Sequence, residues 1–382
     1  MIGDSAPWIP AVAPFLVASF VCGISVPVSI WIARRTGAVA EHDAERHIHP
    51  QPTPRLGGIA MFLGFAVAIG IFGGSIAVRW QIIAVCLAVT VAMALDDIFD
   101  ISWQSKLAIE VGAGALVALS GIVITFIAVP GLSATTVWQL GWLAVPVTIV
   151  WIAGMQVSVN FLDGADGVAA GVVAIVAAVC LLAAINRLQA PGDVQSGVIV
   201  MSGAIMGCCL GFIVFNLPPA RVFMGDAGSH FLGVALGILT VLGVAKIVVG
   251  LSLLVPLIAL GLPISDTAYA IVRRRRAGRR ATEPDAGHLH HRLLARGMTP
   301  FETALTFYLA TGILGCIALS IYGHRKILDA ALALLVVSLV GLIWRSRRRN
   351  PAHAVEMDDE GFVVVPGHRA MPSHLHHGGE TD

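Results

Sequence analysis

The chain has 382 residues, of which 57% are hydrophobic and only 12% charged, and its mean hydropathy is +0.85. Soluble domains carry about 25% charged residues, so this composition predicts a protein that crosses a membrane several times. It excludes a secreted disulfide scaffold, a nucleic-acid-binding domain and a disordered chain. The net charge of +1 adds little, because the positions of the charges matter more in a membrane protein.

Long apolar runs without Asp, Glu, Lys or Arg indicate the spans, since about 20 apolar residues cross a bilayer as a helix. The run 111–162 is too long for one helix and is divided by Val129-Pro130-Gly131 and the polar stretch 133–136. We therefore predict an all-α fold with about eleven transmembrane helices. The runs are 5–33, 56–78, 80–95, 111–162, 167–186, 194–220, 227–245, 247–265, 303–324 and 330–344.

Basic residues in the loops predict the orientation. With the N-terminus outside, nineteen Lys and Arg residues face the cytoplasm and five face the other side. The C-terminus is then cytoplasmic. Residues 1–350 form the predicted transmembrane domain, and 351–382 lack apolar periodicity and form a predicted disordered cytoplasmic tail.

Unusual polar residues collect at the predicted cytoplasmic helix ends, which indicates a catalytic or binding face there. The first cluster holds Asp96, Asp97 and Asp100, with Lys106 nearby. Carboxylates beside hydrocarbon are costly and are functional candidates. Asp97 and Asp100 are three residues apart and Asp96 and Asp100 four, so either of these pairs shares one helix face. Such clusters suit Mg²⁺ holding a phosphate, and Lys106 is either a phosphate ligand or a snorkelling lysine.

The second cluster, Asn160-Phe-Leu-Asp163-Gly-Ala-Asp166-Gly167, brings two carboxylates into an otherwise uncharged run. The third runs from Phe215-Asn216 to Gly225-Asp226-Ala-Gly-Ser229 and begins a helix. Asp226 is placed there either to cap that helix or to serve an anion or metal site.

Two loops complete the set. The loop Gly287-His288-Leu289-His290-His291-Arg292 favours phosphate recognition over zinc, because no further cytoplasmic Cys or His partner is evident. The segment Pro52-Thr-Pro-Arg55-Leu-Gly-Gly58 is a shaped loop that enters a span. Together the clusters indicate a diphosphate substrate, a divalent cation and a partner dissolved in the bilayer.

The ordered motifs PTPRLGG, DDIFD…KL, NFLDGADG, FNLPPARVFMGDAGS and GHLHHRL resemble the polyprenyl-phosphate N-acetylhexosamine-1-phosphate transferases, also called glycosyltransferase family 4. The resemblance covers about 42–310. It implies an eleven-helix enzyme of the bacterial inner membrane, with its active site on the cytoplasmic face. The implied reaction transfers GlcNAc-1-phosphate from UDP-GlcNAc to undecaprenyl or decaprenyl phosphate and releases UMP, the first membrane step of a cell-envelope polysaccharide.

The same resemblance implies roles for individual residues. Asn160 and Asp226 would bind Mg²⁺, with Mn²⁺ as an alternative, and Asp96 or Asp97 would deprotonate or orient the lipid phosphate. Asp163 and Asp166 would shape the nucleotide and metal site. The substrate-binding residues would be Arg55, Lys106, Asn216, His288, His290, His291 and Arg292.

The motif forms favour the UDP-GlcNAc branch over the phospho-MurNAc-pentapeptide transferases, which stay an alternative. Two residues depart from the family pattern: His47 stands where lysine is usual and Glu110 where glutamine is common. An intramembrane prenyltransferase and a lipid-linked-sugar transporter are the competing functions. The expected partners are the lipid carrier, the nucleotide sugar and membrane lipids, without nucleic acid; a homodimer is left open.

Overall fold

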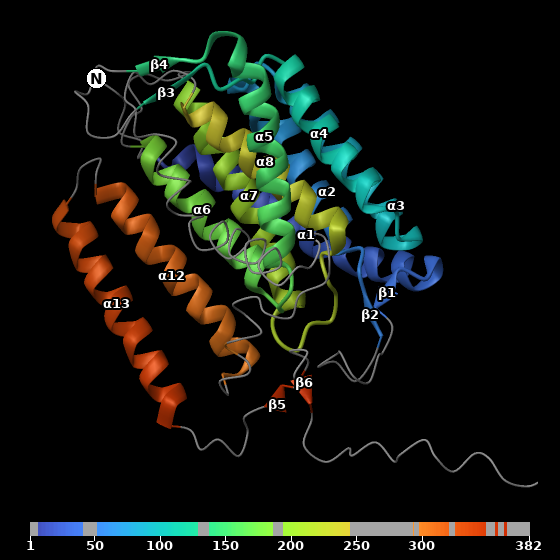
Figure 1. Cartoon of the computed structure of the whole chain (residues 1–382), viewed down its shortest axis with the longest axis vertical. Coiled ribbons are helices and arrows are strands. Elements are labelled where there is room, and N and C mark those ends of the chain that lie inside the picture. The colour runs from blue at the N-terminus through green and yellow to red at the C-terminus, as the bar shows by residue number, and fades with distance from the viewer. Residues whose placement is uncertain are drawn as a thin grey trace, which may run out of the picture.

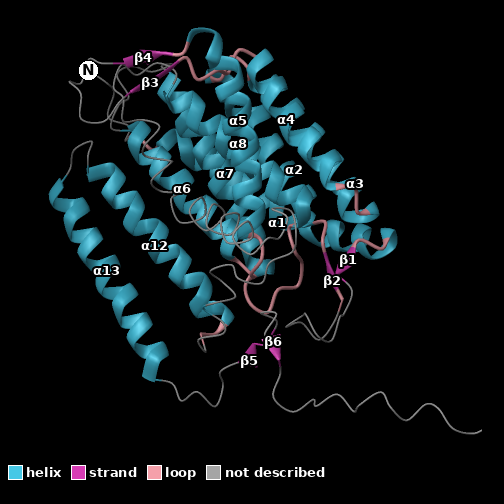
Figure 2. Ribbon diagram, in the orientation of Figure 1, coloured by secondary structure: helices cyan, strands magenta, loops and turns pink. Residues whose placement is uncertain are grey.

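The computed structural model describes residues 7–40, 52–128, 137–185, 194–244, 293, 298–320, 325–348, 356–357 and 363–364. These residues are overwhelmingly helical, which confirms the all-α prediction (Figure 2). The helices are α1 Ile9–Thr36, α2 Gly57–Phe72, α3 Arg79–Phe99, α4 Trp103–Leu119, α5 Ala144–Leu162, α6 Val168–Ile185, α7 Val194–Asn216, α8 Gly225–Val244, α12 Pro300–Ser320 and α13 Arg325–Arg348. The short 3₁₀ helices are η1 Gly73–Ser75 and η2 Gly141–Leu143.

Eight helices in the described ranges are long and apolar enough to cross a membrane, so the chain is a multi-pass membrane protein. They are α1, α2 with η1, α3, α5 with η2, α6, α7, α8 and α12. The 17-residue α4 and the apolar part of α13, Ala331–Ile343, are shorter. The expected run 247–265 lies outside the described residues. The count of eleven and the orientation stay predictions.

Three antiparallel hairpins accompany the helices. β1 Val39–Ala40 pairs with β2 Thr53–Pro54, β3 Phe126–Ala128 with β4 Val137–Gln139, and β5 Glu356–Met357 with β6 Val363–Val364. The β3–β4 hairpin divides the run 111–162 where the sequence predicted a break. It lies at one end of the bundle, and β1–β2 lies at the other (Figure 1). Apart from β5 and β6, the predicted tail 351–382 lies outside the described residues.

Small residues let the central helices approach closely. A Cβ at Gly203, Gly207 or Gly211 of α7 would overlap backbone carbonyls of α1. These glycines recur every four residues and therefore share one helix face. Interfaces of small residues are typical of helices that associate inside membranes, where the hydrophobic effect between helices is weak. The α12–α13 hairpin stands at the edge of the bundle beside α6 (Figure 1).

Candidate active site

One carboxylate, that of Asp226 in the first turn of α8, joins three helices. Lys106 Nζ on α4 donates to Asp226 Oδ2 at 2.8 Å, and Asn160 Nδ2 on α5 donates to Asp226 Oδ1 at 2.9 Å. Asn160 also reaches the hydroxyl of Ser229 at 3.1 Å. Residues separated by more than 50 positions in the sequence thus meet at one point, and three of the predicted site residues are brought together.

Asp96, near the end of α3, is the second carboxylate on the same lysine. Its Oδ2 lies 2.7 Å from Lys106 Nζ, and its Oδ1 accepts a hydrogen bond from the backbone N–H of Ile101 at 2.9 Å. The side chain is 3% exposed. A buried carboxylate is stable only when it is paired and hydrogen-bonded, so Asp96 holds Lys106 toward Asp226.

Asp97 caps helix α8 from a different helix. Its Oδ1 accepts a hydrogen bond from Asp226 N at 2.9 Å, and its Oδ2 accepts one from Ala227 N at 3.0 Å. The first N–H groups of a helix have no partner within the helix, and negative charge is favourable there. The capping role expected as one alternative for Asp226 therefore belongs to Asp97, because α8 begins at Gly225 and Asp226 lies inside it.

The end of β2 and the first turn of α2 are hydrogen-bonded to the segment that precedes α8. Phe223 N donates to Pro54 O, Gly57 N to Phe223 O and Gly58 N to Met224 O, at 2.8, 3.0 and 2.9 Å. Gly58 lies so close to α8 that an added Cβ would overlap the backbone of Gly228. These contacts bring the Pro52–Gly58 segment and the segment that leads into Asp226 together at the β1–β2 end of the bundle.

Asp166 and Asn216 connect the loop between α5 and α6 to the loop between α7 and α8. Asp166 Oδ2 accepts a hydrogen bond from Ala220 N at 3.0 Å. The buried amide of Asn216 accepts from Gly167 N and donates to Val222 O, both at 2.9 Å. In the structure both side chains therefore contact backbone of the neighbouring loop. Their predicted roles toward substrate stay predictions.

Asp163 follows the last residue of α5 and lies in an acidic environment. Burial raises the pKa of Asp163 well above its usual value, and the negative charges of Asp226, Asp97 and Asp166 raise it further. Mutually repelling carboxylates of this kind are stabilised by a cation among them. Lys106 supplies one positive charge against several carboxylates. A bound cation would offset further negative charge here.

The donor chemistry fits Mg²⁺, although the described residues form no preformed metal cage. Among the described residues, no three His, Cys, Asp or Glu side chains form a metal-binding group. Mg²⁺ retains several waters and takes one or two protein carboxylates together with substrate phosphates. Asn160 and Asp226 provide an amide and a carboxylate of this kind, with further carboxylates nearby.

A buried Glu–His pair one turn further into the bundle was not predicted. Glu110 Oε1 on α4 lies 3.1 Å from His230 Nε2 on α8, and both side chains are less than 10% exposed. The available sequence signal was spacing: Glu110 comes four residues after Lys106, and His230 four after Asp226. Residues four apart lie on the same helix face.

Several predicted residues lie outside this cluster. The Arg55 side chain is exposed, while its backbone N–H donates to Ala38 O at 3.0 Å. Asp100 is exposed at the end of α3 with φ of 50°. His288, His290, His291 and Arg292 lie outside the described residues, so their predicted contacts with the nucleotide sugar stay predictions.

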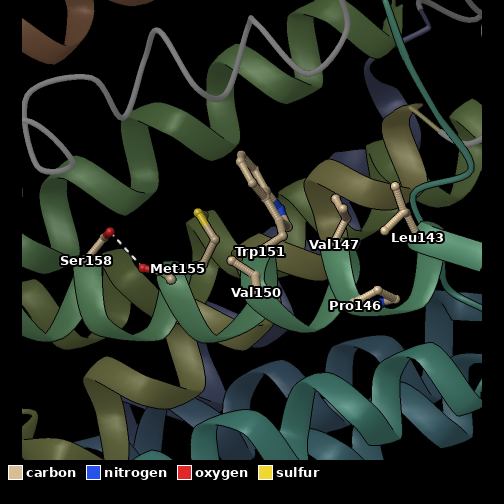
Figure 3. Close-up of a pocket in the computed structure, with 8 residues that line it drawn as sticks. Leu143, Pro146, Val147, Val150, Trp151, Met155 and Ser158 are labelled. Atoms are coloured by element: carbon tan, nitrogen blue, oxygen red, sulfur yellow. Dashed lines mark hydrogen bonds between the residues drawn. The ribbon is translucent and has the colours of Figure 1, made fainter. Parts of the chain in front are cut away.

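An apolar groove of about 460 Å³ runs along one face of α5 (Figure 3). Its lining residues recur every three or four positions from Leu143 to Ser158, which is two residues before Asn160. Fifteen residues of helix span about 22 Å. Trp151 Nε1 is fixed by a 2.9 Å hydrogen bond to Thr240 Oγ1 of α8. The groove therefore offers hydrocarbon-compatible surface along α5, the helix that carries Asn160.

Residues 79–244 match the family described as glycosyl transferase family 4. The chain is 35% identical over 301 residues to a Bacillus subtilis protein named probable undecaprenyl-phosphate N-acetylglucosaminyl 1-phosphate transferase, covering 78% of this chain and 81% of that protein. It is 33% identical over 355 residues to the decaprenyl-phosphate N-acetylglucosaminephosphotransferase of Mycolicibacterium smegmatis, covering 85% and 86%. A Synechococcus phospho-N-acetylmuramoyl-pentapeptide-transferase is 32% identical over 292 residues, covering 72% and 81%.

Proposed function

The chain belongs to glycosyl transferase family 4, and from this premise we propose that it transfers N-acetylglucosamine-1-phosphate from UDP-GlcNAc to undecaprenyl or decaprenyl phosphate. The products are polyprenyl-diphosphate-GlcNAc and UMP, in the first membrane step of a cell-envelope polysaccharide. The observation that carries the proposal is the cluster of Asp226, Lys106 and Asn160, together with an apolar groove on α5, the helix that carries Asn160. Such a site suits a phosphate on a long lipid.

The proposed chemistry exchanges one pyrophosphate bond for another. An oxygen of the lipid phosphate attacks the β-phosphorus of the nucleotide sugar, and the bond from that phosphorus to the bridging oxygen breaks. UMP leaves with the electron pair. Both reacting groups are anionic, so the protein must mainly position them and neutralise charge. Lys106 and a bound cation are suited to that task, and Asp96 holds the lysine in place.

We propose Mg²⁺ as the cofactor, held by Asn160 and Asp226, with Mn²⁺ as a substitute. When bound, the ion would offset negative charge on the phosphoryl groups. The negative charges of Asp226, Asp97 and Asp166 around Asp163 support a bound cation at this site. The Asp97 carboxylate accepts hydrogen bonds from the backbone N–H groups of Asp226 and Ala227, so it fixes the first turn of α8 and orients Asp226 through that backbone.

The groove along α5 supports a polyprenyl acceptor. We propose that the carrier lies along Val147, Trp151 and Met155, with its phosphate toward Asn160. The basic-residue imbalance of the loops supports placing this site at the cytoplasmic face of a bacterial inner membrane. There UDP-GlcNAc would approach from water and the acceptor from the bilayer.

Substitution of Gly154 by leucine tests the groove. Gly154 lies in the lining, and a Cβ there meets no atom within 4 Å, so a larger side chain would fill the groove without disturbing the helix. We expect the KM for polyprenyl phosphate to rise about tenfold and the KM for UDP-GlcNAc to stay unchanged, as measured by UMP release.

Gly112 on α4 provides the matched control, because a Cβ there also meets open space and the residue does not line the groove. Gly112→Leu should leave both KM values unchanged. An unchanged lipid KM for Gly154→Leu would remove the groove from the acceptor site.

The function is tested with purified protein, undecaprenyl phosphate, Mg²⁺ and one of two donors. We expect UMP release with UDP-GlcNAc and none with UDP-MurNAc-pentapeptide, and loss of release when a chelator removes the metal. The greater identity to the two GlcNAc-phosphate transferases supports this donor. Release with the pentapeptide donor alone would reassign the substrate. Release with neither donor would contradict the function.

A further inference from the structure

The Glu110–His230 pair connects α4 to the backbone of Asp226 on α8. His230 Nδ1 lies 2.9 Å from the carbonyl oxygen of Asp226, which only accepts hydrogen bonds, so Nδ1 must donate. His230 Nε2 lies at hydrogen-bond distance, 3.1 Å, from Glu110 Oε1. The pair therefore forms a continuous bridge from α4 to the backbone of Asp226. Hydrogen bonds at both ring nitrogens fix the position of the buried His230 side chain relative to Glu110.

The bridge runs parallel to the Lys106–Asp226 contact. Lys106 and Glu110 are four residues apart on α4, and Asp226 and His230 are four residues apart on α8. Residues at this spacing lie one above the other on a helix. Two contacts between the same two helices, one turn apart, fix both the axial and the rotational register of α4 against α8.

The third helix of the site is tied to the same turn of α4. Gln156 Nε2 on α5 donates to the backbone oxygen of Glu110 at 3.2 Å, and Gln156 is fully buried. Asn160 follows Gln156 by one turn of α5. The level of Glu110 and His230 thus connects the three helices that carry Lys106, Asn160 and Asp226.

We propose that Glu110 and His230 are positioning residues, which set the register of α4 against α8 and so hold Lys106 against Asp226 for the transfer reaction. This inference rests on the proposed function and assigns residues beyond the carboxylate motifs. Neither residue needs to touch substrate. Their contribution is to turnover, because a shift of Lys106 relative to Asp226 displaces the charges that neutralise the reacting phosphates.

The test separates positioning from stability by removing both partners. Breaking a buried pair at one side leaves an uncompensated polar group, whereas replacing both partners with apolar residues is often neutral for stability. We therefore compare Glu110→Leu, His230→Leu and the double variant in detergent, measuring the melting temperature and the kcat and KM for UMP release. The double variant should melt near the wild-type temperature, yet its kcat should be about tenfold lower with both KM values within twofold.

Glu110→Gln is the conservative variant, because its amide N–H can donate to a neutral His230 Nε2 and keep the bridge. We expect its kcat to stay within threefold of wild type. The control is Ser19→Ala on α1, which removes a 3.0 Å hydrogen bond to Gly207 O of α7, between two helices that carry none of the site carboxylates. Its kcat should be unchanged.

Two results would overturn the inference. One is a double variant that melts near the wild-type temperature and has wild-type kcat, which would make the pair structural only. The other, decisive even if the leucine variants do not fold, is a Glu110→Gln protein that melts like wild type but loses tenfold or more in kcat. Absence of UMP release by the wild-type protein in the same assay would instead contradict the proposed function.

Discussion

Replacing Asp226 with asparagine is expected to lower the kcat for UMP release by about a thousandfold or more, the scale on which single electrostatic groups act in phosphoryl transfer. The carboxylate is contacted by Lys106 and Asn160 at once, and it is a proposed Mg²⁺ ligand. Asparagine has nearly the same shape but no charge. Its amide N–H group would also face a donor, either Lys106 Nζ or Asn160 Nδ2. The melting temperature should change little, so the measurement is kcat at saturating substrates on folded protein.

Asp100 provides the matched control for this substitution. It belongs to the same acidic motif as Asp96 but is exposed at the end of α3. Asparagine tolerates its positive φ of 50°. We expect Asp100→Asn to keep wild-type kcat. Wild-type turnover by Asp226→Asn would exclude this carboxylate from the metal site and from the charge balance of the reaction.

Replacing Gly58 with alanine is expected to abolish turnover and to destabilise the fold by about 3 kcal/mol. The added methyl group would overlap the backbone nitrogen and Cα of Gly228, and backbone cannot rotate away as a side chain can. The first turn of α2 and the first turn of α8 would have to separate. That separation would break the hydrogen bonds that hold the residues before Asp226. Thermal unfolding in detergent and UMP release measure the two effects.

Gly70 is the control in the same helix, α2. A Cβ there would meet only the ring of Trp80, at 3.9 Å, which is ordinary van der Waals contact. Gly70→Ala should retain the wild-type melting temperature and turnover. A Gly58→Ala protein with normal melting and turnover would show that α2 and α8 do not need this close approach.

The membrane character and the helical segments follow from composition and run length alone. Charge-free stretches such as 167–186 and 227–245 coincide closely with α6 and α8, because charged groups are excluded from hydrocarbon wherever the helix lies. The break in the run 111–162 was readable for a similar reason, since Pro, Gly and polar residues interrupt an apolar helix. The polar clusters were recognisable because ionisable residues at the ends of such segments are rare.

The assignment of individual carboxylates depended on the packing. The sequence pattern does not assign different roles to Asp96, Asp97 and Asp100. In the structure, however, Asp96 pairs with Lys106, Asp97 caps α8 and Asp100 is exposed. Which one reaches α8 depends on the rotation of α3 and on the left-handed residue that ends it, and neither is encoded by a local pattern.

The Glu110–His230 pair likewise forms only in the folded protein. The same holds for the hydrogen bonds between residues 54–58 and the segment that precedes α8. Their partners are 120 and about 170 residues apart in the sequence. Local propensity and hydrophobic period act over a few turns of helix, so they determine which segments enter the membrane. The identity of each polar partner is determined by helix rotation, register and close glycine contacts, which exist only once the bundle has assembled.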